Sequence, residues 1–177
     1  NRPSNHNKYI GFFGQTNYAT IKNLSLTNVN FTNAYIVAGS FVGLSRSTTI
    51  DNCSASGIVA LSGIAVNYST SIAGGLVGYA FCSSSGSSTC TIRNSYSTAS
   101  VDSGGGIYIG GLVGYITSTT ILNSYSTGSV ESASSNSGGL VGHKTSSGTV
   151  TDSFYDKETS GKADTGKGTG KTTAQMK

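Results

Sequence analysis

Acidic side chains are the residues of this 177-residue chain that most directly suggest chemistry. Paired carboxylates cleave glycosidic bonds, and grouped carboxylates bind calcium. Asp102 and Glu131 each follow an equivalent apolar residue by ten positions, so a repeating structure would stack them on neighbouring coils. We predict a solvated acidic edge or a weak cation site there, and a weak calcium site at Asp152, Asp156 and Glu158. The seven acids are Asp51, Asp102, Glu131, Asp152, Asp156, Glu158 and Asp164.

Cysteines and histidines form no zinc pattern in this sequence, because His6 and His143 lie far apart and neither has metal-ligand spacing with a cysteine. Cys82 and Cys90 bracket a short polar stretch, and we predict a disulfide between them. Cys53 has no evident partner and is expected to be a small buried side chain. Apart from the calcium alternative, no cofactor is expected.

A repeat supplies the elements that must position these residues. Five clips of two apolar residues, closed by Gly and opened by Gly or Ser, occur at 11–14, 40–43, 75–78, 111–114 and 139–142. An apolar anchor follows each clip by seven to fourteen residues. The anchors are Ile21, Ile50, Ile92, Ile121 and Val150, with spacings of 29, 42, 29 and 29. Such a period predicts stacked repeats, and the longer spacing predicts an insertion loop at 82–90.

Aligned on the anchors, several columns are chemically uniform. Two residues after each anchor stands Asn or Asp, namely Asn23, Asn52, Asn94, Asn123 and Asp152. Equivalent residues on stacked coils lie about 4.8 Å apart, so these amides could bond along the stack. We predict a buried structural ladder for this column. Two positions further, Tyr96 and Tyr125 could either pack between coils in the core or contact a ligand.

The composition favours strands over helices, because the chain is rich in Ser, Thr, Val, Ile and Tyr and contains 25 Gly. We predict an all-β, right-handed parallel β-solenoid (a β-helix) of about five coils of roughly 29 residues, each with three short faces. Residues 1–152 would form the repeat array, and residues 153–177 a C-terminal capping tail.

Charge and hydropathy exclude several classes of function. Charged residues make up 10% of the chain, and the net charge is +4. Five of the eleven basic residues are Lys157, Lys162, Lys167, Lys171 and Lys177. They lie in the tail without interleaved aromatics, so we expect no nucleic-acid partner. No apolar run approaches 18 residues, so no membrane insertion is expected. The chain begins at Asn1 without a signal peptide, which favours a piece of a longer protein that could self-associate through its solenoid ends.

Three of the clips, 75–78, 111–114 and 139–142, read Gly-Leu-Val-Gly, and the segments 94–98 and 123–130 continue two of them. These features resemble the GLUG-motif family, although the first two clips contain Phe and lack the later Tyr. The resemblance implies a bacterial or archaeal surface or secreted protein, either adhesin-like or the non-catalytic part of an IgA-specific metalloendopeptidase. The chain contains no His-Glu-x-x-His, so no protease activity is implied.

We therefore expect a non-catalytic extracellular structural or adhesive module of a larger surface or secreted protein. It would bind glycans, surfaces or neighbouring copies through faces rich in Ser, Thr, Asn and Tyr. One alternative is a carbohydrate-active β-helix enzyme, a lyase or hydrolase, which would need clustered carboxylates. Another is an ice-binding solenoid, suggested by a Thr before each anchor. The column two positions after this Thr is too mixed for a flat ice-binding face, since it reads Lys22, Asp51, Arg93, Leu122 and Thr151.

Overall fold

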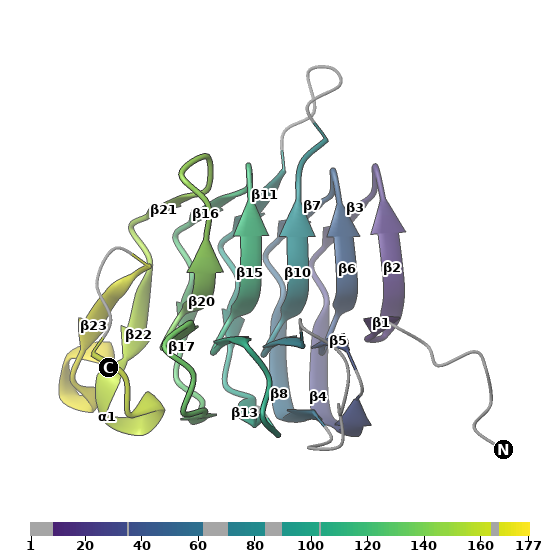
Figure 1. Cartoon of the computed structure of the whole chain (residues 1–177). Coiled ribbons are helices and arrows are strands. Elements are labelled where there is room, and N and C mark those ends of the chain that lie inside the picture. The colour runs from purple at the N-terminus through teal and green to yellow at the C-terminus, as the bar shows by residue number, and fades with distance from the viewer. Residues whose placement is uncertain (1–8, 35, 62–70, 84–89, 103, 164–166) are drawn as a thin grey trace, which may run out of the picture.

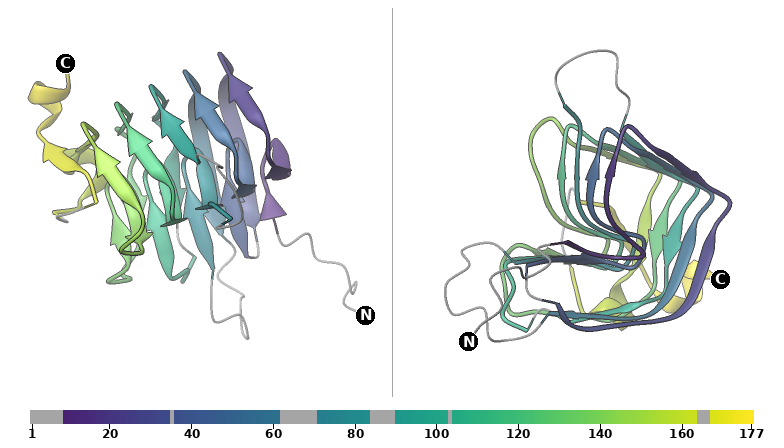
Figure 2. Two further views of the ribbon diagram at one scale, coloured as in Figure 1. Left: turned by 90° about the horizontal axis from the view of Figure 1, so that it is seen from above. Right: turned by 90° about the vertical axis from the view of Figure 1, so that its right-hand side faces the viewer.

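The chain winds five times along the same path and forms parallel sheets that each take strands from successive coils (Figure 1). This computed structural model describes residues 9–34, 36–61, 71–83, 90–102, 104–163 and 167–177. Viewed from the N-terminal end, the chain turns clockwise as it recedes, which is the right-handed sense (Figure 2). The predicted all-β, right-handed parallel β-solenoid is confirmed.

Within the described residues, three sheets contain five strands each. Sheet A contains β1 (Tyr9–Ile10), β5 (Val37–Gly39), β9 (Ile72–Gly74), β14 (Tyr108–Gly110) and β19 (Ser137–Gly138). Sheet B contains β2 (Phe13–Asn17), β6 (Val42–Arg46), β10 (Val77–Phe81), β15 (Val113–Thr117) and β20 (Val141–Lys144). Sheet C contains β3 (Thr20–Lys22), β7 (Thr49–Asp51), β11 (Thr91–Arg93), β16 (Thr120–Leu122) and β21 (Thr149–Thr151).

The fourth sheet, sheet D, begins with the long strands β4 (Ser25–Ala34) and β8 (Ser54–Leu61). It continues with β12 (Tyr96–Ser97), β13 (Ser100–Asp102), β17 (Tyr125–Ser126), β18 (Val130–Glu131), β22 (Phe154–Asp156) and β23 (Thr169–Lys171). The prediction of three faces is therefore wrong, because each clip separates two strands instead of lying within one. Figure 2 shows that sheets A and B meet at an inward-pointing corner, which gives the coil an L-shaped section.

The closing glycines of the clips lie at this inward corner, where two strands of neighbouring coils approach closely. A Cβ on Gly114 would lie 2.5 Å from Ile72 Cγ2 and 2.7 Å from the carbonyl oxygen of Ala73. A Cβ on Gly78 would lie 2.6 Å from Val37 Cγ1. Close-packed interiors do not tolerate such contacts without a shift of the backbone. Glycine is thus required here for lack of space.

The L-shaped section divides the apolar core into two clusters. The larger one contains the clip residues that point inward and the sheet C anchors, which are Phe41, Leu76, Leu112, Leu140, Ile21, Ile50, Ile92 and Ile121. The smaller one lies between sheets A and D and contains Ala38, Ala73, Ile109, Val59, Leu61, Val101 and Val130. Each fully buried large side chain contributes on the order of 1.5–3 kcal/mol before entropy is subtracted. Cys53 is buried in the larger cluster, as predicted.

The Asn column turns the chain between sheets C and D. All five residues have left-handed backbone conformations, with φ of 56° at Asn23, 53° at Asn52, 51° at Asn94, 47° at Asn123 and 45° at Asp152. All five are exposed, so the prediction of a buried ladder is wrong. Asn52 Nδ2 donates to Asn23 Oδ1 at 2.8 Å, whereas Asn94 Nδ2 donates to Asp51 Oδ1 instead. The column contains Asn and Asp because these residues tolerate positive φ.

A buried ladder does exist, one residue further along the chain. Ser95, Ser124 and Ser153 each donate a hydroxyl hydrogen bond to the carbonyl oxygen two residues earlier. The same hydroxyls accept backbone N–H groups from the preceding coil. These bonds run from Cys53 N to Ser95 Oγ at 3.1 Å, from Ser95 N to Ser124 Oγ at 3.3 Å, and from Ser124 N to Ser153 Oγ at 3.1 Å. The serine side chains therefore join successive coils at the corner.

The tail covers the C-terminal end of the stack with α1 (Lys157–Ser160), β23 and the 3₁₀-helix η1 (Thr173–Met176), as Figure 2 shows. Lys162 Nζ donates to the carbonyl oxygen of Ser132 at 2.8 Å. Lys167 Nζ donates to the carbonyl oxygens of Ser137 at 2.9 Å and Gly142 at 2.8 Å. These bonds fasten the tail to the last full coil.

The predicted disulfide joins Cys82 and Cys90, whose Cα atoms lie 5.5 Å apart. The interior of the predicted insertion loop, residues 84–89, lies outside the described residues, as do His6 and Asp164.

Candidate ligand-binding surface

Tyr96 and Tyr125 stack on the outside of sheet D, where β12 and β17 place them in register. Their ring centroids are 4.8 Å apart and their planes differ by 2°. The two residues are 36% and 37% exposed, so core packing does not explain them. Successive strand residues point to opposite faces, and the buried Ser97 and Ser126 take the inward positions instead. Burial raises the pKa of the Tyr125 hydroxyl, and the neighbouring Tyr96 adds to this shift.

The second face of the Tyr96 ring looks toward a small residue. Ser54 is in register with Tyr96, and Ser25 is in register with Ser54, so no ring continues the stack in this direction. An open hollow of about 290 Å³ occupies the space, and we call it the amide hollow. It is lined by Asn23, Leu24, Ser25, Asn52, Cys53, Ser54 and Tyr96.

The polar groups of the amide hollow are neutral and are oriented by contacts with one another. Asn52 Nδ2 donates to Asn23 Oδ1 at 2.8 Å, and the hydroxyls of Ser25 and Ser54 are 2.8 Å apart. Each Asn amide carries two N–H donors and a carbonyl acceptor, so Asn23 Nδ2 and Asn52 Oδ1 can still bond to a ligand. The hollow thus combines an aromatic face with neutral donors and acceptors.

A charged pair lies on the strands next to this corner. Arg93 Nη2 and Asp51 Oδ2 are 2.9 Å apart, and Asn94 Nδ2 donates to Asp51 Oδ1 at 2.9 Å. The hydrogen bonds from Arg93 and Asn94 hold the pKa of Asp51 below its ordinary value. Asp51 is therefore an ionised carboxylate that is already paired, and it does not line the hollow.

On its other side, the tyrosine pair borders Phe154 and the C-terminal tail. Phe154 continues the column on β22, and Lys171 Nζ lies 5.5 Å from the Phe154 ring centroid. An open hollow of about 230 Å³ separates this side of the column from η1, and we call it the lysine hollow. It is lined by Tyr125, Phe154, Lys171, Gln175 and Met176. The tyrosine pair thus has a neutral hollow on one side and a cationic one on the other.

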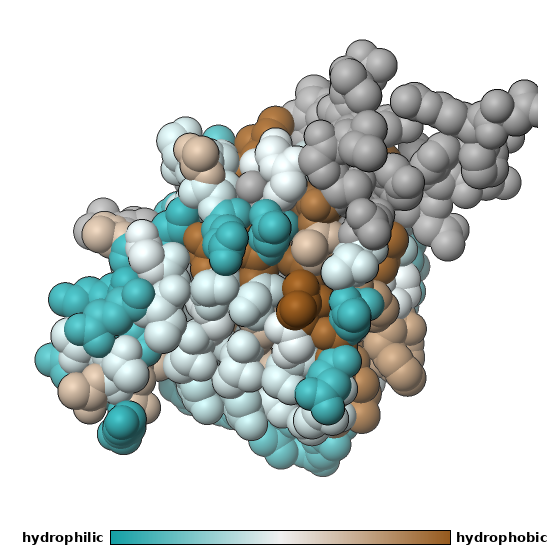
Figure 3. All heavy atoms as spheres, turned by 90° about the horizontal axis from the view of Figure 1, so that it is seen from below, coloured by the Kyte–Doolittle hydropathy of each residue, from teal (hydrophilic) through white to brown (hydrophobic). Residues whose placement is uncertain are grey.

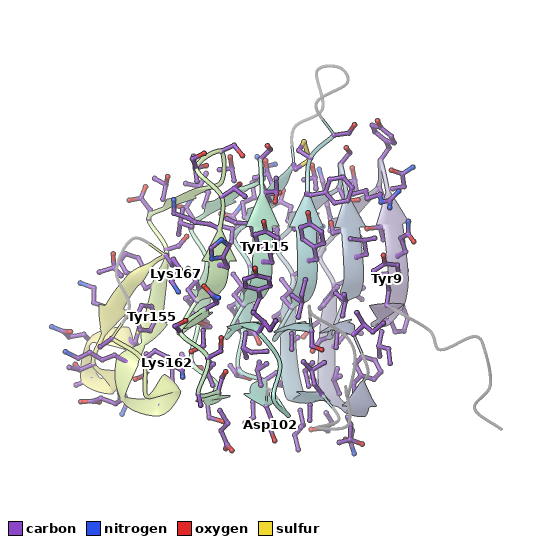
Figure 4. The ribbon with its side chains drawn as sticks, in the orientation of Figure 1. Tyr9, Asp102, Tyr115, Tyr155, Lys162 and Lys167 are labelled. Carbon is purple, nitrogen blue, oxygen red and sulfur yellow. A yellow bond between two sulfur atoms is a disulfide. The ribbon has the colours of Figure 1, made fainter. Side chains whose placement is uncertain are left out.

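Asp102 lies at the far end of sheet D, on the underside of the molecule (Figure 4), and Glu131 is its neighbour on the next coil. They are in register on β13 and β18, so the predicted stacking on neighbouring coils is confirmed. Both are exposed, and Asp102 Oδ1 accepts a hydrogen bond from the N–H of Gly104 at 3.0 Å. Figure 3 shows that this underside has mostly intermediate hydropathy, with scattered hydrophilic and hydrophobic side chains. Neither acid lines the amide hollow or the lysine hollow.

The three residues predicted as a weak calcium site have different surroundings. Asp152 is exposed at its corner, whereas Asp156 is buried and caps α1 by accepting the N–H groups of Glu158 and Thr159. Thr173 donates its hydroxyl to Asp156 Oδ2 and its N–H to Glu158 Oε2, both at 2.8 Å. Burial raises the pKa of Asp156, but these hydrogen bonds outweigh it and leave the pKa below its ordinary value. Among the described residues, no three acidic, histidine or cysteine side chains are grouped to hold a metal ion.

A second aromatic cluster was not anticipated from the sequence. Tyr79, Tyr108, Tyr115 and His143 meet at the inward corner of sheets A and B, where Figure 4 labels Tyr115. Tyr115 stacks on Tyr79 and on Tyr108, each with a centroid distance of 4.9 Å. Burial, with a smaller contribution from Lys167, lowers the pKa of His143. The sequence signal that could have revealed this cluster is the residue after each closing Gly, because it is aromatic in the last three coils.

Comparisons with known proteins agree with the repeat. The GLUG motif matches residues 105–131, which comprise one coil from β14 to β18. A protein of Evansella cellulosilytica, named a Gly-rich membrane protein, is 40% identical over 97 residues. The match covers 51% of this chain and 11% of that protein, so it spans about a tenth of the relative's length. No solved structure matches the chain. In the part of the chain that the structure describes, no helix is long and apolar enough to cross a membrane.

Proposed function

We propose that this GLUG-containing solenoid is a non-catalytic extracellular module that binds glycan chains at the tyrosine pair. The observation that carries the proposal is the open face of Tyr96 beside the amide hollow. Binding sites for small ligands commonly combine an apolar wall with a few placed polar groups, and this hollow has both.

The chemistry of a sugar ring suits this arrangement. One face of a pyranose presents C–H groups, which the negative face of an aromatic ring attracts. Its hydroxyls are both donors and acceptors, as are the amides of Asn23 and Asn52 and the hydroxyls of Ser25 and Ser54. Stacking of Tyr96 on Tyr125 holds the platform in place before a ligand arrives, which reduces the entropy lost on binding.

An extracellular location is supported by the disulfide, by the name of a relative and by the low content of charged residues. The disulfide between Cys82 and Cys90 is typical of oxidising compartments. The relative from E. cellulosilytica is named a membrane protein, and the low content of charged residues resembles that of secreted repeat proteins.

Glycan binding can be tested with two variants that change the amide hollow in opposite ways. On an array of neutral and acidic glycans, followed by calorimetry, Tyr96→Ala removes the platform and Ser54→Tyr fills the hollow with a further ring. Both should weaken binding about tenfold or more. Tyr18→Ala is the matched control, because Tyr18 is 61% exposed but lies elsewhere.

Unchanged affinity in both folded variants would place the ligand elsewhere, and no binding to any glycan would refute the proposal. Release of unsaturated or reducing sugars by the wild-type chain would instead favour the carbohydrate-active enzyme.

Contact between copies at the N-terminal end is a second candidate function. In the described part of the chain, β1, β2, β3 and β4 each pair with a strand on one side only, and such edges can pair with another chain. Phe12 is 61% exposed beside them. Concentration-dependent association in light scattering, reduced by Phe12→Ser, would support this mode, whereas a monomer at all concentrations would refute it.

A further inference from the structure

We infer that the lysine hollow takes a carboxylate-bearing sugar, so that the surface prefers acidic glycans. This inference rests on the proposed function and adds a ligand class to it. Tyr96 lines the amide hollow and Tyr125 lines the lysine hollow, so the two hollows flank one tyrosine pair, whose ring centroids are 4.8 Å apart. A ligand that contacts both must therefore be an oligosaccharide instead of a single sugar.

The ammonium group of Lys171 distinguishes this residue from other lysines of the tail. Lys162 and Lys167 are bonded to backbone carbonyls of the last full coil. Lys171 instead places its Nζ 5.5 Å from the Phe154 ring centroid, and its ammonium has no carboxylate partner among the described residues. Its donors thus stay available at the wall of the lysine hollow.

Two acids lie near Lys171, and both are already engaged with other groups. Asp156 is in register with Lys171, but its carboxylate accepts hydrogen bonds from α1 and from the hydroxyl of Thr173. Glu158 Oε2 accepts the N–H of Thr173. Neither residue lines the hollow, so Lys171 supplies the one formal charge on its lining.

The remaining lining fits the body of a sugar. The rings of Tyr125 and Phe154 and the side chain of Met176 supply apolar surface, and Gln175 offers an amide to hydroxyl groups. A carboxylate that replaces water next to an ammonium group forms a charge-assisted hydrogen bond, which is stronger than a neutral one. The lining therefore favours an acidic sugar over its neutral counterpart.

The experiment compares uronate oligosaccharides with their methyl-esterified forms, which have the same chain without the charge. Calorimetry on the full chain should show that galacturonate, mannuronate or glucuronate oligomers bind more tightly than the matching ester. Lys171→Met should weaken binding of the acid about tenfold and leave binding of the ester unchanged. Raised salt should weaken binding of the acid and leave binding of the ester unchanged, because salt screens charge pairs.

Lys157→Met is the matched control, because Lys157 is an exposed lysine on α1 that does not line the hollow. Equal affinities for acid and ester would overturn the inference, and so would a Lys171→Met variant that binds the acid as tightly as wild type. Either result would leave the proposal of glycan binding intact. If neither acid nor ester binds, the inference is also overturned, and the glycan array then decides the proposed function by itself.

Discussion

The first two coils and the last three take the same backbone path through the corner of sheets C and D but present different side chains there. The outward column holds Ser25 and Ser54 in the first two coils, and an aromatic ring in each of the last three. The inward column beside it changes at the same boundary, from the partly buried Leu24 and the buried Cys53 to three buried serines. The amide hollow lies at this boundary.

The comparison separates the residues that set the path from those that set the surface. A closing glycine and a corner Asn or Asp occur in all five coils, because all five corner residues have positive φ and most of the closing glycines have no space for a Cβ. Outward-facing positions are not restricted by close approach or by positive φ. A tyrosine on one coil can therefore follow a serine on the coil before it while the backbone at the corner stays the same. A binding site can thus arise where a column changes its residue type.

The largest effect is expected from the clip glycines. Gly114→Ala should lower the free energy of unfolding by about 3 kcal/mol or more, because its Cβ would lie 2.5 Å from Ile72 Cγ2. Gly14→Ala, at the equivalent place in the first coil, would meet only the carbonyl oxygen of Tyr9 at 3.1 Å and should cost about 1 kcal/mol or less. Urea denaturation measures both. Equal losses would show that the corner is equally tight in all coils.

The next effect concerns the buried serine ladder. Ser124→Ala removes a hydroxyl that donates to the carbonyl oxygen of Leu122 and accepts the N–H of Ser95. The buried N–H of Ser95 then loses its partner, whereas the carbonyl oxygen of Leu122 still accepts the N–H of Asn94 at 3.2 Å, so the change should cost about 1–3 kcal/mol. Cys53→Ser places a hydroxyl in the same column of the second coil and should change stability by less than about 1 kcal/mol. A Ser124→Ala variant as stable as wild type would refute the role of the ladder.

A smaller effect is expected from the fastening of the tail at low pH. The pKa of Asp156 is below its ordinary value of 3.8 in the folded chain, so its stabilisation is present above pH 3.8 and is lost as the pH falls through the folded pKa. Asp156→Asn should cost about 1 kcal/mol at pH 6 and remove this part of the acid dependence. Thermal melts between pH 6 and 2.5 test it. If the melting temperatures of wild type and variant fell in parallel as the pH was lowered, this role of Asp156 would be contradicted.

The smallest effect is expected from the free thiol. Burial raises the pKa of Cys53 above 9.0, so its stabilisation is complete below pH 9 and declines as the pH rises toward the folded pKa. Cys53→Ala should remove this alkaline decline, which is about 1 kcal/mol or less. A thiol reagent at pH 8 should label the native chain far more slowly than the unfolded one. Rapid labelling of native protein would show that the corner opens easily.

Much of the fold could be predicted from spacing alone, because equivalent residues of a solenoid must recur with the coil. The parallel β-solenoid, the disulfide between Cys82 and Cys90 and the stacking of Asp102 on Glu131 all followed from the repeat. The buried role predicted for the Asn column was wrong, because uniformity alone does not distinguish a side-chain ladder from a backbone requirement. The aromatic cluster around Tyr115 was missed because it combines residues from both sides of a clip.

The sequence by itself determined the period, the strand character and the residues that share a column, since these depend only on local preference and repetition. Only the tertiary structure decided which way each column points, since a strand residue faces core or solvent according to where its sheet lies. The fourth face, the exposed tyrosine pair and its two hollows are therefore properties of the coil's shape. That shape depends on contacts across the inward corner, between backbone segments that are far apart in the chain.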